Sequence, residues 1–271
     1  MDGSERRADG RDLARQAATV VAFVATVAVN GLANALPLNG LTTGEISDRF
    51  PVLVVPAGYV FGIWGLIYLG LAAFTVYQAL PDRRADPLLR RLGWLPALTG
   101  ALNVAWILLW HGEAFALTVP VMVALLATLA AIEVMLRGDG RTHSGAERWA
   151  VAVPFSIYLG WVTVATIANV AAALASLGFT GLGADPPLIA AAVLLVGLAI
   201  ACAMVLRFRD PAYGCVIVWA YAGIVVKETG TPLVPIVAGV AAVVVAVLVV
   251  AVAAGLVGGG RTGRRAVVAA G

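Results

Sequence analysis

The 271-residue chain has a mean hydropathy of +0.95, with 61% hydrophobic and only 12% charged residues. A soluble domain usually carries about 25% charged residues, because its surface must be covered with polar groups. The composition therefore excludes a soluble globular protein, and it also excludes disordered and collagen-like chains. The two cysteines, Cys202 and Cys215, lie in apolar stretches and are expected to be small packing residues, not a disulfide or a redox pair. The chain is an integral membrane protein by composition.

Eight apolar segments are long enough, or nearly so, to cross a hydrocarbon core, which needs about 20 residues. They do not alternate in polarity, so they predict helices and not barrel strands. We expect an all-α fold, a polytopic transmembrane helical bundle of about eight spans. The segment 211–226 is short, and a re-entrant or interfacial helix is the alternative there. The predicted spans are residues 17–35, 57–80, 92–110, 114–136, 149–177, 187–206, 211–226 and 232–257.

The basic residues are distributed unevenly between the connections. Sixteen of the 18 Lys and Arg residues fall on one predicted side, and only Arg49 and Lys227 fall on the other. This asymmetry predicts a multi-pass protein of the cell membrane with both termini in the cytoplasm. The net charge of +3 then reflects topology, and no nucleic-acid partner is expected. Alternatively, residues 1–35 act as a cleaved signal peptide, which leaves seven spans and an external N-terminus.

Aromatic side chains share helical faces with amides or hydroxyls in several of the first five spans, at spacings of three, four and seven residues. The more central tryptophans favour a ligand pocket, which is typically aromatic with a few polar groups. Plain helix packing is the alternative, and Trp94, Trp110 and Trp149, near segment ends, fit interfacial anchors. The aligned residues are Asn30 and Asn34; Phe61, Trp64 and Tyr68; Thr99, Asn103, Trp106 and Trp110; and Tyr158, Trp161, Ala165 and Asn169.

Few other residues suggest chemistry. The connection 37–56 is either a lid over the outer mouth of the bundle or a plain solvated loop. Glu133 lies four residues before Arg137, which predicts an ion pair or snorkelling. His111 is expected to be a hydrogen-bonding surface residue of the turn, with axial ligation of a haem as the alternative, and Lys227 lies at a span end. The sequence has no Walker, zinc-protease, metal-ligand or nucleophile-elbow motif, so we predict no catalytic or metal-binding residues and no required cofactor.

Three elements of the sequence resemble one known family. They are the stretch Pro56–Tyr68, the Leu-Asn-x-x-Trp element Leu102–Trp106, and the Tyr-x-x-Trp…Ala-Thr…Asn element Tyr158–Asn169. In this order they are similar to the second-, third- and fifth-helix signatures of the TspO/MBR family, the tryptophan-rich sensory proteins. The resemblance covers residues 17–177.

The resemblance implies a five-helix bundle with a pocket for flat hydrophobic ligands such as porphyrins, closed by the first loop. The sequence departs from the family pattern because Phe61 and Trp64 are one residue closer, and Tyr59 stands where Trp is common. The fifth helix lacks the proposed sterol motif, which weakens sterol binding. Tyr68 is added to the site by its helical face. The ligand-binding residues are then Tyr59, Phe61, Trp64, Tyr68, Asn103, Trp106, Tyr158, Trp161 and Asn169.

Together these features predict a TspO-like membrane sensor or translocator that binds a planar hydrophobic ligand such as a porphyrin or another tetrapyrrole. Enzymatic breakdown of that ligand stays open. The alternatives are a permease for a small apolar or amphipathic solute and a purely structural protein. The expected partners are membrane lipids and the hydrophobic ligand, and a homodimer with a second copy stays open. The predicted organisation is a tail (1–16), the five-helix domain (17–177), three additional helices (178–258) and a second tail (259–271).

Overall fold

The computed structural model describes residues 9–36, 40–138, 142–179 and 181–257, and all regular structure within these ranges is helical. The long helices are α1 (Gly10–Ala35), α3 (Ile63–Ala79), α5 (Leu95–His111), α6 (Phe115–Arg137), α8 (Val153–Ser176), α9 (Pro186–Phe208), α10 (Pro211–Lys227) and α11 (Leu233–Ala253). The shorter elements are α2 (Thr43–Asp48), α4 (Pro87–Leu92), α7 (Gly145–Glu147), a π-helical turn (Arg148–Ala152) before α8, and 3-10 turns at Gly58–Gly62, Pro81–Arg83 and Gly181–Gly183.

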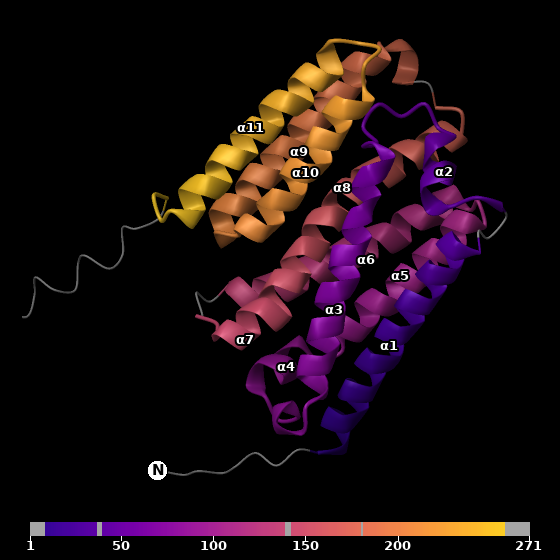
Figure 1. Cartoon of the computed structure of the whole chain (residues 1–271). Helices are drawn as coiled ribbons and strands as arrows, with labels where there is room; N and C mark the ends of the chain where they lie inside the picture. Colours follow the sequence, from indigo (N-terminus) through magenta and orange to yellow (C-terminus); the bar gives the residue numbers. More distant parts are fainter. Residues whose placement is uncertain (1–8, 37–39, 139–141, 180, 258–271) are drawn as a thin grey trace, which may run out of the picture.

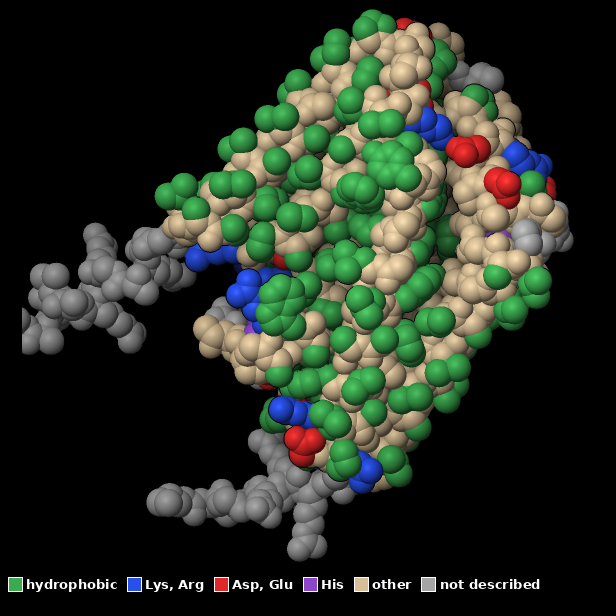
Figure 2. All heavy atoms as spheres, in the orientation of Figure 1, with side chains coloured by type: hydrophobic (Ala, Val, Ile, Leu, Met, Phe, Trp, Pro, Cys, Tyr) green, Lys and Arg blue, Asp and Glu red, His purple; other side chains and the backbone are tan. Residues whose placement is uncertain are grey.

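The long helices coincide with the eight predicted spans, which confirms the all-α polytopic bundle. Among the described residues, six helical stretches are long and apolar enough to cross a membrane; α5 and α10, at 17 residues each, are shorter apolar helices. α10 is one continuous helix that runs alongside α9 and α11 (Figure 1). Figure 2 shows hydrophobic side chains over the middle of the molecule and charged side chains mainly towards its two ends, as a bilayer requires.

The helices form two groups that meet at α8. α1 packs against α3 and α5, α5 packs against α6, and both α3 and α6 pack against α8. α10 packs against the other side of α8 and is flanked by α9 and α11 (Figure 1). Gly160 permits the close approach of α8 to α10, because a Cβ there would lie 3.0 Å from Val216 Cβ and 3.1 Å from Tyr213 O. α8 is accordingly the most deeply buried of the candidate spans.

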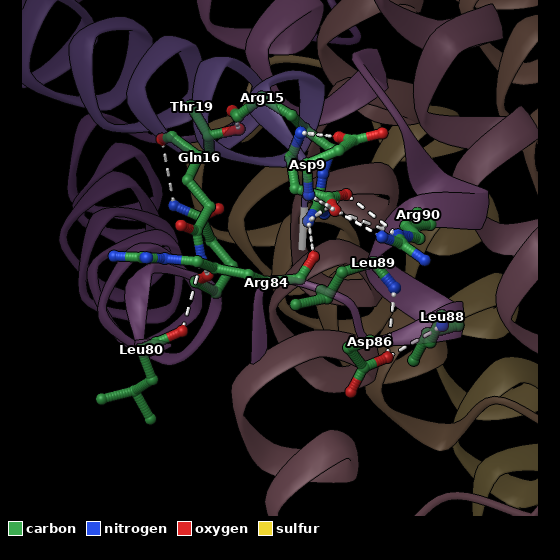
Figure 3. A network of polar contacts seen from close by, with 12 residues as sticks. Asp9, Arg15, Gln16, Thr19, Leu80, Arg84, Asp86, Leu88, Leu89 and Arg90 are labelled. Carbon is green, nitrogen blue, oxygen red and sulfur yellow. Dashed lines mark hydrogen bonds and ion pairs between the residues drawn. The ribbon is translucent and has the colours of Figure 1, made fainter. Parts of the chain in front are cut away.

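α1 begins at Gly10, seven residues before the predicted start of the first span. Asp9 accepts a hydrogen bond from Asp12 N (2.9 Å), and Asp12 accepts one from Asp9 N (3.2 Å), so a capping box starts the helix in the polar stretch. Figure 3 shows how this end is fixed: Arg15 donates to Arg84 O (2.9 Å), and Arg90 forms an ion pair with Asp12 (2.5 Å). The charged start of α1 is therefore anchored to the connection that follows α3.

Neither cysteine forms a disulfide. Cys202 is partly buried and Cys215 is exposed, and both are free thiols. The expectation of two small core residues is not met, because Cys202 is only partly buried and Cys215 lies on the outer surface.

Candidate functional site

An aromatic cavity lies between α3, α5 and α8, beneath α2. Its free volume is about 40 Å³, whereas pockets that hold a drug-sized ligand measure about 300–1,000 Å³. The cavity therefore has room for a water molecule and not for a large ring. The lining residues are Thr43, Ser47, Pro56, Phe61, Trp64, Trp106, Trp110, Trp161, Val164, Ala165, Ala168 and Asn169.

Five of the nine predicted ligand-binding residues line this cavity, and their rings pack mainly edge to face. Trp161 of α8 lies edge-on to Phe61 (centroids 5.5 Å apart, 80° between planes) and to Trp64 (6.2 Å, 81°). On α5, Trp106 stacks on Trp110 at 5.6 Å and 23°. Such contacts fix the rings against one another. The cavity wall consequently presents several wide apolar faces in defined orientations.

Two buried polar groups on α8, the amide of Asn169 and the indole N–H of Trp161, differ in their hydrogen bonding. Asn169, which is 3% exposed, accepts a hydrogen bond from Trp106 Nε1 (2.8 Å) and donates one to Thr118 Oγ1 (2.8 Å). Trp161 is equally buried, but its indole Nε1 has no hydrogen-bond partner among the described residues. A buried donor without an acceptor is costly. The lining thus includes Asn169, whose amide is satisfied, and Trp161, whose buried N–H lacks an acceptor among the described residues.

α2 covers the cavity and is bonded to its wall. Trp110 Nε1 donates to Thr43 O (3.2 Å), and Thr43 Oγ1 lies 3.1 Å from His111 Nε2. These contacts support the lid interpretation of the connection 37–56; residues 37–39 lie outside the described residues. His111 is a hydrogen-bonding residue as expected, but it is not a surface residue: it ends α5 and is 1% exposed beneath α2. The described residues contain no cluster of three or more side chains suited to a metal ion.

Two exposed ion pairs hold the other end of α2. Arg49, just after α2, pairs with Glu113 in the α5–α6 turn at 2.6 Å, and Asp48 pairs with Lys227 at the end of α10 at 2.7 Å. The hydrogen bond from Arg49 lowers the pKa of the Glu113 carboxyl below its ordinary value. The lid is therefore tied to both helix groups, and Lys227 has a structural partner.

The other four predicted ligand-binding residues do not line the cavity. Asn103 and Tyr158 belong to a buried hydrogen-bond chain instead: Asn30 Nδ2 donates to Asn103 Oδ1 (2.7 Å), and Asn103 Nδ2 donates to the Tyr158 hydroxyl (3.1 Å). This chain joins α1, α5 and α8. Interhelical amide bonds of this kind are a common means of joining membrane helices, so both side chains support the site without facing it.

Tyr68 and Tyr59 make aromatic contacts outside the lining of the cavity. Tyr68 stacks on the lining residue Trp64 (5.5 Å, 21°) and so backs the wall. Tyr59 is 50% exposed and meets Trp219 of α10 edge-on at 5.3 Å. Tyr59 is thus part of the contact between the two helix groups.

Sequence reasoning missed several lining residues. Trp110 was expected to be an interfacial anchor, yet it is 3% exposed and lines the cavity. Its spacing of four residues from Trp106 was the available signal. Trp94 and Trp149 are 55% and 67% exposed, as anchors should be. Thr43, Ser47 and Pro56 come from the first connection, whose path over the bundle could not be read from periodicity.

A comparison with protein families shows the family to which the chain belongs. The family model for the TSPO-like protein matches residues 16–252. The match therefore extends through α9, α10 and α11, beyond the 17–177 stretch covered by the sequence resemblance. No curated protein and no solved structure matches the chain. With a match over most of its length, this integral membrane helical bundle belongs to the TSPO-like protein family.

Proposed function

We propose that this protein is a membrane sensor or translocator that binds a planar hydrophobic ligand, such as a porphyrin or another tetrapyrrole, in the cavity beneath α2. The observation that carries the proposal is the set of four tryptophans around the cavity, together with the unpartnered N–H of Trp161. Indole faces stack on flat conjugated rings, and the free N–H offers a hydrogen bond to a polar edge. The proposal assigns binding to this site and no bond-making step.

Binding requires the cavity to enlarge. The space of about 40 Å³ must grow several-fold to admit a large ring. α2 is the element suited to move, because it is held by two side-chain ion pairs at the surface and few hydrogen bonds. An open groove of about 560 Å³ borders the lid and contains Phe115, which packs edge-on against Trp110 at 5.2 Å. The groove offers a route from the surface to the cavity wall.

The proposal is tested by titrating purified protein in detergent with protoporphyrin IX and following tryptophan fluorescence. We expect saturable quenching in the wild type and a weaker apparent affinity in Trp64→Phe and Trp161→Phe. Trp161→Phe removes the N–H and keeps a ring, so its loss of affinity reports the hydrogen bond as well as the stacking area.

Trp94→Phe and Trp149→Phe are the matched controls, because both tryptophans are exposed and lie outside the cavity. Their titrations should follow the wild-type curve after correction for the missing fluorophore. Quenching that does not saturate, or equal affinities in the cavity and control variants, would remove the assignment of this cavity as the ligand site.

A further inference from the structure

A second buried polar cluster lies at the end of the bundle opposite α2. Glu133 and Arg137 come from the last turns of α6, Ser156 from the start of α8, and Asp210 from the residue before α10. Arg137 pairs with Glu133 (Nε to Oε1, 2.5 Å) and with Asp210 (Nη2 to Oδ1, 3.2 Å), and it donates to Ser156 Oγ at 2.8 Å. The expected Glu133–Arg137 ion pair is therefore present, but it is part of a larger cluster.

The carboxyl groups of Asp210 and Glu133 differ in the hydrogen bonds that they accept. Asp210 accepts hydrogen bonds from the backbone N–H groups of Ala212 (3.0 Å) and Tyr213 (3.3 Å), and the Ser156 hydroxyl also donates to it. Glu133 is 1% exposed; Arg137 Nε lies 2.5 Å from its Oε1 but is not aligned for a hydrogen bond, and neither carboxyl oxygen has an aligned donor among the described residues. Hydrogen bonds favour the ionised form of the group that receives them. The arrangement suits an ionised Asp210 and leaves Glu133 short of donors.

The charges do not balance if both carboxyls are ionised. Two carboxylates would then face one guanidinium in a nearly dry interior, where an unpaired charge is costly. The charged groups that act on Glu133 are Arg137 of its own helix and Asp210 before α10. Tyr213 and Cys215 on α10 also interact with Asp210, and in their neutral forms they add no positive charge.

We propose that the Glu133–Arg137–Asp210 cluster is a proton-binding site that holds one proton, carried by Glu133 and shared with the carboxylate of Asp210. The bound proton makes the cluster neutral and supplies the missing donor. Because Asp210 also caps α10, the site lies where α6 and α8 meet the group of α9, α10 and α11. Loss of the proton leaves an excess negative charge at this junction, which water admission or movement of α10 would relieve. The junction is thereby sensitive to protons.

Infrared spectroscopy of the full chain in lipid vesicles at pH 7 tests this directly. We expect a carbonyl stretching band of a protonated carboxylic acid that shifts in D₂O. Glu133→Gln should lose the band and still fold, because the amide has the shape of the protonated acid. Asp210→Asn should lose it as well, since Glu133 is then left alone with Arg137 and can ionise as a simple ion pair.

Asp12→Asn is the matched control, because Asp12 is also buried but interacts with two guanidiniums, those of Arg15 and Arg90; it should keep the band. Glu113→Gln, an exposed partner of Arg49, serves the same purpose should the first control fail to fold. A wild-type spectrum without the band, or a band that survives in either cluster variant, overturns the proposal. None of these outcomes depends on porphyrin binding, so the test is independent of the proposed function.

Discussion

At the scale of single residues, two buried asparagines on different helices, Asn103 of α5 and Asn169 of α8, have different roles. Asn103 bonds Asn30 and Tyr158 and so joins helices away from the cavity. Asn169 lines the cavity and links Trp106 to Thr118. The difference lies in what each amide meets across the helix interface, because each is almost completely buried and must find its partners there.

Replacing Asn169 by Ala should destabilise the protein. The substitution leaves the Trp106 N–H without its acceptor and the Thr118 hydroxyl without its donor, and each buried unpaired group costs about 1–3 kcal/mol. Thermal unfolding in detergent should show a lower midpoint. Val240→Ala, at a 58% exposed position of α11, is the control and should change stability by about 0.5 kcal/mol or less. Equal midpoints for Asn169→Ala and wild type would show that the amide is not structurally important.

At the scale of elements, α2 illustrates how a short helix is positioned by its ends. Its first turn is capped by Thr42 and Glu45 in a capping box, and the hydrogen bonds from Thr42 lower the pKa of Glu45. Its last turn is held by ion pairs that are exposed to solvent. Exposed pairs contribute little and are screened by salt. The end of α2 is therefore fastened weakly, whereas its inner face is held by Ile46, at 1% exposure, and by the hydrogen bonds of Thr43.

Arg49→Gln should loosen the lid without unfolding it. We expect amide hydrogen exchange over residues 43–48 to become faster by roughly two- to fivefold, because one of the two ion pairs is lost. Salt at about 1 M should accelerate exchange in the wild type more than in the variant. α1 amides should not respond. Identical exchange of the 43–48 segment in both proteins would mean that the Arg49–Glu113 pair does not hold α2.

The same pair predicts a pH dependence. Because Arg49 lowers the pKa of Glu113 in the folded lid, the contribution of the pair is complete above the ordinary glutamate value and is lost as the pH falls through the lowered value. The exchange rates of wild type and Arg49→Gln, each compared at equal pH, should therefore converge in acid. A constant ratio of the two rates down to about pH 2 would contradict this.

At the scale of the whole molecule, the group of α9, α10 and α11 supports the cavity from outside. Ala57 N donates to Gly223 O (3.1 Å), and Trp219 Nε1 donates to Val60 O (3.2 Å). These bonds join α10 to the chain segment that contains Pro56, one of the lining residues. The family match over both groups agrees with a single structural unit. α10 therefore helps to set the position of the cavity wall.

Gly223→Ala should disturb this contact. A Cβ at residue 223 would lie 2.2 Å from Val60 Cγ2 and 3.1 Å from Pro56 Cβ, and a buried Val has little freedom to move away. Overpacking of this kind costs about 1–3 kcal/mol, so the unfolding midpoint should fall. Gly239→Ala on α11 is the control, because its nearest contact would be Val225 at an ordinary 3.7 Å. A Gly223→Ala protein as stable as this control would argue against close packing of α10 on that segment.

The sequence by itself determined the class of protein, the eight helical segments and the aromatic faces of the second, third and fifth spans. These features depend on composition and on local periodicity, which the chain carries wherever it folds. Trp64, Trp106, Trp161 and Asn169 could be selected in this way because they repeat at helical spacing. The start of α1 could not be placed, since its polar residues give no apolar signal and only the capping box fixes them.

Only the tertiary structure decided which face of each helix packs against which neighbouring helix. Helical spacing aligns Asn103 with Trp106, but rotation and depth against α1 and α8 place Asn103 in a helix-joining bond and Trp106 at the cavity. The spacing of Glu133 and Arg137 likewise could not indicate that Asp210 joins them, because Asp210 lies 77 residues after Glu133 in the chain. Contacts between distant segments arise from packing and not from local pattern. For that reason the tertiary structure, and not the sequence, located the lid, the cavity and the buried carboxyl pair.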